Sequence, residues 1–228
     1  MSFKEPPPVN ATDEEVREAY EEISKIYKVL EESFGKKVRE RGLELLNPRS
    51  GEEILEVGFG TGCALVDIAR LVGKEGKVYG VDISEKMVKL AEERVEKEGL
   101  SDRVELSKGD ARELSYEDNK FDRVYMAETL ELFSAPDITK VLDEIKRVLK
   151  NVGCLGIVSM NREGNENSKF VRVYEWLHQK FPRYLNCRPI YVADVLRNSG
   201  YEIEEEEDVM SGWLCPMKIV VAKQEKET

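Results

Sequence analysis

Residues 52–65, EEILEVGFGTGCAL, decide the fold that the sequence predicts. An apolar strand leads to Val57, glycine then falls at positions 58, 60 and 62, and a helical pattern begins after the last glycine. Glycine has no Cβ atom, so a ligand can lie against the backbone of such a turn, and the following helix points its amide-rich N-terminus at the same space. The stretch therefore indicates a binding site for a nucleotide cofactor.

The spacing of these glycines separates two kinds of nucleotide site. A dinucleotide fingerprint needs G-x-G-x-x-G, and counting from Gly58 its sixth position is Cys63 here. The pattern G-x-G-x-G, preceded two residues upstream by Glu56, resembles motif I of the class I S-adenosylmethionine-dependent methyltransferases. A nicotinamide-dependent oxidoreductase is the rival enzyme class, and Cys63 in place of the third glycine argues against it. The rival outside catalysis is a cofactor-binding partner protein without turnover of its own.

Two later segments extend the resemblance. The strand pattern Val78-Tyr79-Gly80-Val81-Asp82 ends in a carboxylate, where the ribose hydroxyls of the cofactor must sit. Gly109-Asp110-Ala111 resembles the adenine-binding segment of the family. The resemblance covers residues 20–221 and implies S-adenosyl-L-methionine as the cofactor. It also implies an α/β fold, with a doubly wound, Rossmann-like, mostly parallel seven-stranded sheet and an antiparallel C-terminal strand.

Strand and helix patterns alternate from residue 53 onward, as in a parallel sheet covered on both faces. We expect strands over 53–57, 77–82, 104–107, 121–126, 153–159, 201–208 and 217–223. Ser84 is expected to cap the helix after the second strand, and two later helices are expected over 169–180 and 192–198. The acidic run Glu204–Asp208 is interpreted as a solvated strand edge.

The expected domain organisation has four parts. Residues 1–11 form a mobile leader, 12–48 form lid helices, 49–223 form the methyltransferase domain, and 224–228 form a frayed tail. An apolar helical stripe runs from Val16 to Phe34. In the family a helix here covers the cofactor, and the spacing of Tyr20 and Tyr27 resembles the tyrosine-bearing lid of quinone-biosynthesis methyltransferases. Ordinary core packing is the alternative for this stripe, and Tyr27 is the member expected to reach the ligand.

The resemblance implies a set of cofactor-binding residues: Tyr27, Glu56, Gly58, Phe59, Gly60, Gly62, Asp82, Ile83, Met87, Asp110, Ala111 and Ala127. Within it, Gly58, Phe59 and Gly60 line the methionine part through backbone groups, and Ala127 does so from the end of the fourth strand. Glu56 orients the amino group, directly or through water. The alternative is a stray strand acid, which is disfavoured because an unpaired buried carboxylate is expensive.

The nucleoside part is assigned to the ends of the second and third strands. Asp82 is expected to accept hydrogen bonds from both ribose hydroxyls, and a helix-capping role is its alternative. Ile83 and Met87 either sandwich the adenine or are core residues. Asp110 is expected to take the adenine amino group and the Ala111 amide its ring nitrogen, unless the acid only belongs to a Gly-Asp turn.

Composition limits the classes of ligand that the protein is expected to bind and the cellular compartment in which it is expected to act. The 228 residues carry a net charge of -11, which repels phosphate backbones and disfavours a nucleic-acid substrate. The four cysteines are scattered and the single histidine has no nearby partner, so no metal site is expected. There is no stretch typical of a secretory signal or of an integral membrane segment, which predicts a cytoplasmic protein. The sequence does not indicate an oligomeric state.

The fourth strand and the C-terminal part suggest the substrate. Nucleic-acid or protein N-methyltransferases often carry an Asn/Asp-Pro-Pro-aromatic motif where this chain has Ala127-Glu128-Thr129-Leu130, so a small-molecule substrate is expected. The segment from His178 to Ile190, with Gly212-Trp213, resembles ubiquinone and menaquinone biosynthesis methyltransferases, whose quinol-like aromatic substrates need a base. His178 is either that catalytic base or a structural residue. Arg188 either pairs with an anionic substrate group or balances the acidic surface.

Overall fold

The computed structural model describes residues 35–180, 187–212 and 215–225, with the side chains of 177–180 left out. Within these ranges, seven strands form one sheet in the order β3-β2-β1-β4-β5-β7-β6. The strands are β1 Glu53–Val57, β2 Lys77–Asp82, β3 Val104–Lys108, β4 Phe121–Ala127, β5 Leu149–Met160, β6 Tyr201–Ser211 and β7 Cys215–Gln224. The first five pair in parallel, and β7 lies antiparallel between β5 and β6. This confirms the predicted fold class.

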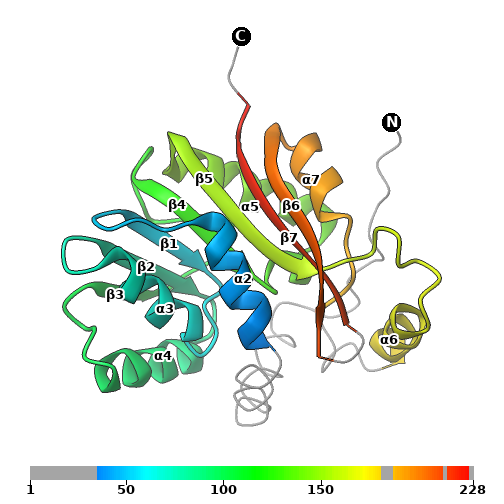
Figure 1. Ribbon diagram of the computed structural model, residues 1–228, viewed down its shortest axis with the longest axis horizontal. Helices are drawn as coiled ribbons and strands as arrows, with labels where there is room; N and C mark the ends of the chain where they lie inside the picture. Colours follow the sequence, from blue (N-terminus) through cyan, green and yellow to red (C-terminus); the bar gives the residue numbers. More distant parts are fainter. Residues whose placement is uncertain (1–34, 181–186, 213–214, 226–228) are drawn as a thin grey trace.

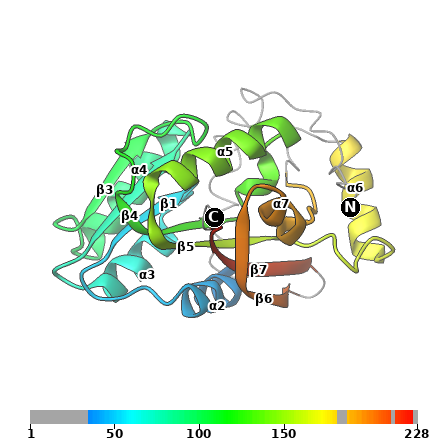
Figure 2. The ribbon, with the colours of Figure 1, turned by 90° about the horizontal axis from the view of Figure 1, so that it is seen from above.

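Helices cover both faces of the sheet. They are α2 Lys36–Leu46, α3 Cys63–Val72, α4 Glu85–Lys97, α5 Ala135–Val148, α6 Lys169–Lys180 and α7 Val192–Asn198, with a short 3₁₀ helix η2 at Leu130–Leu132. Figures 1 and 2 show α2 and α3 on one face and α5 and α7 on the other. Side chains alternate along β1 accordingly, with Ile54 packed among residues of α2, α3 and α4 and Leu55 among those of α5. Because both faces are covered, the strand is apolar almost throughout.

The expected bounds of the strands agree with the observed ones to within one residue, except for β5 and for the β6 and β7 hairpin. β5 begins at Leu149 instead of residue 153, because the chain passes from α5 directly into a segment that pairs with Phe121 before a register shift. Gly153 lies at this irregularity, where a Cβ atom would come within 2.9 Å of the Asp122 carbonyl oxygen. β6 and β7 both extend toward their connection, to Ser211 and from Cys215. β6 lies at the edge of the sheet, as the acidic run predicted.

α2 belongs to the core of the sheet domain, although it falls within the range expected to form a lid. Its buried residues face the sheet, and a Cβ atom on Gly42 would lie 2.7 Å from Val158 and 2.9 Å from the Tyr125 hydroxyl. Glycine at this position therefore lets the helix approach the strands closely. Residues 12–34, with Tyr20 and Tyr27, lie outside the described residues. None of the described helices is long and apolar enough to cross a membrane.

Candidate active site

The glycine turn between β1 and α3 has the backbone conformation that its sequence predicts. The φ angles of Gly58, Gly60 and Gly62 are 72°, 52° and 80°, a region that side-chain-bearing residues rarely adopt. A Cβ atom on Gly58 would lie 2.3 Å from the Thr129 side chain. The Thr129 hydroxyl shares its one proton between the carbonyl oxygens of Gly58, at 3.3 Å, and Ala127, at 2.8 Å. The turn is thereby fixed against the carboxyl end of β4.

Asp82 joins the same turn to the end of β2. Its Oδ2 accepts a hydrogen bond of 3.0 Å from the Gly60 amide, and its Oδ1 accepts one of 2.9 Å from the Ser84 amide. The Ser84 hydroxyl accepts from the Met87 amide at 3.4 Å, which confirms Ser84 as the cap of α4. A carboxylate oxygen can accept more than one hydrogen bond, so this geometry is compatible with ribose binding by Asp82.

Glu56 lies on β1 two residues before the turn, between Gly80 of β2 and Tyr125 of β4. It is only 3% exposed. Burial, and after it the charge of Glu56, raises the pKa of the Tyr125 hydroxyl, so the two side chains are close. The role of Glu56 toward the cofactor amino group stays a prediction.

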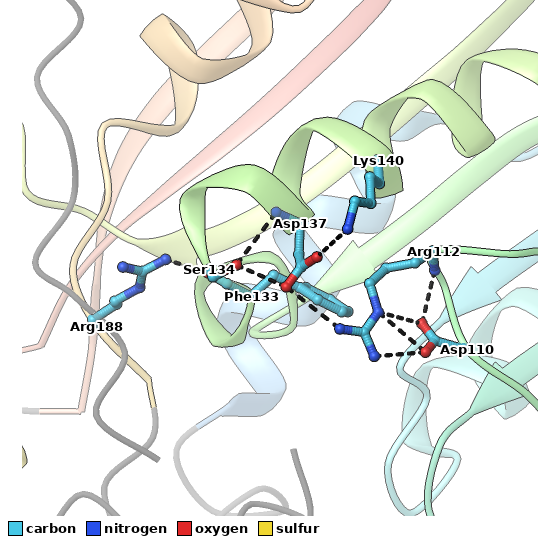
Figure 3. Close-up of polar contacts among 7 residues, drawn as sticks. All are labelled: Asp110, Arg112, Phe133, Ser134, Asp137, Lys140 and Arg188. Carbon is cyan, nitrogen blue, oxygen red and sulfur yellow. Dashed lines mark hydrogen bonds and ion pairs between the residues drawn. The ribbon is translucent and has the colours of Figure 1, made fainter. Parts of the chain in front are cut away.

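The predicted adenine segment contains an ion pair that the sequence did not reveal. Arg112 Nη2 lies 2.7 Å from Asp110 Oδ2, and the guanidinium lowers the pKa of the Asp110 carboxyl. Figure 3 shows Arg112 between Asp110 and Asp137, the latter at the start of α5. The Asp110 carboxylate is therefore already engaged, and an adenine amino group would share it with Arg112. The Glu113 amide also donates to the Asp110 carbonyl oxygen at 3.1 Å, so the Gly-Asp turn alternative stays open.

The residues expected around the adenine ring differ in exposure. Ile83 is 41% exposed and is available to a ligand. Met87 is 2% exposed and packs in the core beside Ala91, which favours the core role that was its alternative. Phe59 is also buried, and a Cβ atom on Gly80 would lie 2.7 Å from its ring. Ala111 is buried in the cluster on the α5 face.

The chain leaves β4 through a strained residue. Glu128 has φ 52°, the left-handed region, and its amide donates to the Val158 carbonyl oxygen at 2.8 Å. A non-glycine residue in this region costs on the order of 1–3 kcal/mol and tends to persist at functional sites. The conformation turns the chain from β4 into η2 and aims the following side chains across the end of β5.

Glu131 is a candidate functional residue that the sequence reasoning missed. It lies in η2 with 0% exposure, and its Oε1 accepts a hydrogen bond of 3.1 Å from the Met160 amide at the end of β5. Burial, with a smaller contribution from the neighbouring charge of Glu128, raises the pKa of the Glu131 carboxyl to about 7. The only sequence signal was a second acid three residues after Glu128, on a segment that ends a buried strand.

Arg188 is buried, contrary to the expected role in balancing the acidic surface, and pairing with an anionic substrate group stays a prediction. It is 2% exposed, its Nε donates to the Glu131 carbonyl oxygen at 3.3 Å, and its Nη2 donates to the Phe133 carbonyl oxygen (Figure 3). Burial lowers its pKa to about 10, so the guanidinium stays charged at neutral pH. The arginine fastens the turn between η2 and α5 and does not balance the protein surface.

Two predicted residues have side chains outside the described part of the chain. His178 belongs to α6, but its side chain is outside the described part, and Tyr27 lies in the undescribed range before residue 35. α6 itself lies beyond the carboxyl end of β5, as Figure 2 shows, on the side where ligands bind in open α/β sheets. Among the described residues, no cluster of three or more histidine, cysteine or acidic side chains could hold a metal ion.

Comparisons with known proteins agree with this geometry. A family model described as a methyltransferase domain matches residues 54–153. A demethylmenaquinone methyltransferase from Bacillus mycoides is 37% identical over 145 residues, which are 62% of this chain and 60% of that protein. A solved SAM-dependent methyltransferase from Aquifex aeolicus is 30% identical, with a TM-score of 0.63 over 87% of this chain and 97% of the other. The [4+2]-cyclase SpnF, 21% identical, has a TM-score of 0.75 over 97% of this chain and 99% of its own, and supports the fold alone.

The glycine turn, the sheet order and these matches define a class I methyltransferase fold with a nucleotide-cofactor site at its carboxyl edge. The chain belongs to the family of S-adenosylmethionine-dependent methyltransferases. This confirms the predicted family and its cofactor, S-adenosyl-L-methionine, and none of these matches supports the nicotinamide-dependent alternative. The chain spans about three fifths of the length of the demethylmenaquinone methyltransferases that it matches.

Proposed function

We propose that the protein transfers the methyl group of S-adenosyl-L-methionine to a small aromatic acceptor, with a reduced demethylmenaquinone-like quinol as the first candidate. The observation that carries the proposal is the glycine turn, which is hydrogen-bonded to Asp82 on one side and to Thr129 on the other. The name of the relatives, demethylmenaquinone methyltransferase, supports the acceptor. The net charge of -11 supports a small molecule over nucleic acid.

The backbone of the turn would hold the cofactor. The three glycines present no Cβ atoms to a ligand, and Asp82 would accept hydrogen bonds from its ribose. Glu56 and Ala127 would hold the methionine part, and Asp110 and Ala111 the adenine. When bound, the cofactor supplies an activated methyl group on a positively charged sulfur. The protein contributes mostly alignment, because a displacement requires the acceptor atom, the methyl carbon and the sulfur to be nearly collinear.

The described residues beyond the end of β5 suit a flat aromatic acceptor. The rings of Phe170 and Tyr174 on α6 are stacked, with centroids 5.9 Å apart. They belong with Cys187 and Cys215 to the partly buried residues around one core cluster. Burial, followed by the charges of Cys187, Glu131, Cys215 and Glu128, raises the pKa of the Tyr174 hydroxyl. An apolar wall of rings and sulfur atoms favours aromatic over strongly polar acceptors.

The direct test is a methyl-transfer assay with the purified chain. S-adenosylmethionine labelled with deuterium in its methyl group is incubated with short-chain demethylmenaquinone, reduced in place by dithionite. Mass spectrometry is expected to find the labelled methyl group on the quinone ring, and the oxidised quinone is expected to be inert. Labelled methyl transfer to an amine or carboxylate of an acceptor panel, without transfer to the quinol, would contradict the proposed acceptor. Cofactor binding without any transfer would support the non-catalytic alternative.

We further propose that residues 12–34 close the site as a lid. The stripe that begins at Val16 supports this, and α2 marks where the lid must end, because α2 is a core helix. Deletion of residues 1–34 is expected to abolish turnover while the circular dichroism spectrum stays that of a folded α/β domain. Unfolding of the truncated chain would instead assign the stripe to the core.

A cytoplasmic location is also proposed, supported by four cysteines that are all free of disulfides.

A further inference from the structure

Glu131 lies where the cofactor turn and the acceptor side of the sheet meet. It follows Thr129 by two residues, and Thr129 donates to the Gly58 carbonyl oxygen of the glycine turn. Its Oε1 accepts from the amide of Met160, the last residue of β5. The carboxylate is therefore held at the carboxyl ends of β4 and β5, two neighbouring strands, at the ligand-binding edge of the sheet.

Two polar atoms at this place are buried without a hydrogen bond of ordinary geometry. Neither Glu131 Oε2 nor Ser159 Oγ makes one to any residue that the structure describes, and both residues are 0% exposed. The Ser159 hydroxyl is nevertheless close enough to the Glu131 carboxyl to lower its pKa. A buried polar group left in this state costs about 1–3 kcal/mol, more if it is charged. Ser159 directly precedes Met160, whose amide holds the other carboxylate oxygen. The carboxylate and the hydroxyl lie near each other without a hydrogen bond of ordinary geometry, and a polar ligand atom between them would complete both groups.

We propose that Glu131 is the proton acceptor of the reaction, taking the proton from an acidic ring hydroxyl of the methyl acceptor, with Ser159 as a second polar contact to that hydroxyl. The acceptor class, a phenol or quinol, rests on the proposed function. The position of Glu131 between the glycine turn and the aromatic wall of α6 carries the proposal.

The proposed reaction transfers one methyl group and releases one proton overall. Glu131 takes the proton of the ring hydroxyl, and the electron pair of the resulting phenolate moves through the ring to the adjacent carbon. That carbon forms a bond to the methyl carbon while the bond from methyl carbon to sulfur breaks, and its electron pair stays on sulfur. The ring carbon then loses its hydrogen as a proton to water, and Glu131 returns its proton to the oxygen. The products are the methylated quinol, S-adenosylhomocysteine and one proton.

The surroundings of Glu131 suit this exchange. Burial and the charge of Glu128 favour the protonated form. Hydrogen bonds from the amides of Glu131 and Met160, together with the nearby Ser159 hydroxyl and the charge of Arg188, favour the ionised form. Within the described part of the chain, the charge of Glu131 also raises the pKa values of Tyr174 and Cys215. With a pKa of about 7, the carboxyl group is available as a base and is also able to hold a proton at neutral pH.

A structural role is the alternative to be tested. A protonated Glu131 that only connects η2 to β5 would also accept the hydrogen bond from the Met160 amide and would also be buried. The substitution Glu131→Gln separates the two roles, because glutamine keeps a carbonyl oxygen for the Met160 amide and the same size, but cannot take a proton. Glu52→Gln is the matched control: Glu52 also has a hydrogen-bonded carboxylate, 2.8 Å from Arg123 Nε, but it lies at the opposite, amino edge of the sheet.

The experiment measures turnover of reduced short-chain demethylmenaquinone from pH 5.5 to 9 and affinity for S-adenosylhomocysteine by calorimetry. For Glu131→Gln we expect turnover to fall by about 10²–10⁴-fold, cofactor affinity to stay within about twofold, and the rise of turnover through neutral pH to vanish. Glu52→Gln is expected to keep the wild-type pH profile. A Glu131→Gln variant with wild-type melting temperature and turnover within about threefold of wild type would overturn the proposal and leave the proposed function intact.

If the wild-type protein does not methylate the quinol, the proposed function fails, and Glu131 is tested by binding instead. The probe is a naphthohydroquinone added with S-adenosylhomocysteine, and the readout is the infrared band of a protonated carboxyl group. The Glu131 band is identified as the one missing from Glu131→Gln. A change in this band when the probe binds supports the proposal. Glu52→Gln is expected to show the same change whenever it binds the probe. An unchanged band would refute it.

Discussion

The two halves of the sheet present different kinds of groups at its carboxyl edge. In the half with β1, β2 and β3, the backbone shapes the site: glycines with positive φ angles form the turn, and Asp82 is held by two amides. In the half with β4, β5 and β7, buried side chains shape it: Glu131, Ser159 and Arg188 lie with the rings of α6 around the strand ends. The first half suits a cofactor that every family member shares, and the second half can vary with the acceptor.

The largest expected effect is the loss of cofactor affinity in Gly58→Ala, which changes the glycine turn in the half of the sheet with β1, β2 and β3. The φ angle of 72° disfavours alanine, and its Cβ atom would lie 2.3 Å from Thr129. We expect cofactor affinity, measured by calorimetry, to fall at least about hundredfold, which is roughly 3 kcal/mol. Gly164→Ala is the matched control, because Gly164 has the same φ of 72° with nothing within 4 Å of an added Cβ. Equal losses in both variants would mean that backbone strain alone, and not the fit of the turn, is being measured.

The next effect concerns the side-chain half and the stability of the fold. The pKa of Glu131 is raised from 4.5 to about 7, so the folded chain binds this proton more tightly than the unfolded chain. The stabilisation is therefore fully present below the unfolded value and is lost as pH rises through about 7, with a maximum loss on the order of 3 kcal/mol. Urea unfolding at pH 5 and pH 8 is expected to show this loss in the wild type and not in Glu131→Gln. Identical pH dependence in both chains would mean that Glu131 does not titrate in this range.

A smaller effect is expected for Asp82→Ala. Hydrogen bonds to charged groups contribute roughly 1.5–3 kcal/mol each, so cofactor affinity should fall by at least about tenfold. Ser84→Ala is the control, because it removes the cap of α4 without touching the carboxylate, and it is expected to lower stability by about 1 kcal/mol and leave affinity unchanged. If the two variants lose affinity equally, Asp82 acts through the helix start and not through the ribose.

The smallest effect is expected for His178→Gln, which decides between the two proposed bases. If Glu131 takes the proton, turnover of His178→Gln on the reduced quinone should stay within about threefold of wild type, well short of the contribution of a positioned base. A loss of a hundredfold or more, with cofactor affinity retained, would transfer the role of base to His178. The pH profile of the variant provides the second readout.

The two halves also differ in how well the sequence predicts them. The bounds of β1, β2, α6 and α7 agree with the expected ranges, and the turn is correct because glycine is strongly favoured at its φ angles, which leaves a visible sequence pattern. Glu131 and Arg188 were missed or misread because their burial depends on contacts between segments 57 residues apart. Glu131 stands between Leu130 and Leu132, and this local sequence does not show that the rest of the chain will bury its carboxylate. The pair between Asp110 and Arg112 was missed although the two residues are close in sequence, because Gly-Asp turns accept many neighbours.

The insertion of β7 between β5 and β6 constrains the order in which the molecule can be assembled during synthesis. The strands β1 to β5 can pair as they leave the ribosome, but β5 keeps an unpaired edge until the chain has been made as far as Gln224. An open apolar edge is a site for mispairing with other chains, so the interval between completion of β5 and arrival of β7 is the time of greatest aggregation risk. β6 is synthesised before β7, and its acidic residues are exposed. Repulsion between these like charges opposes premature pairing of one nascent chain with another.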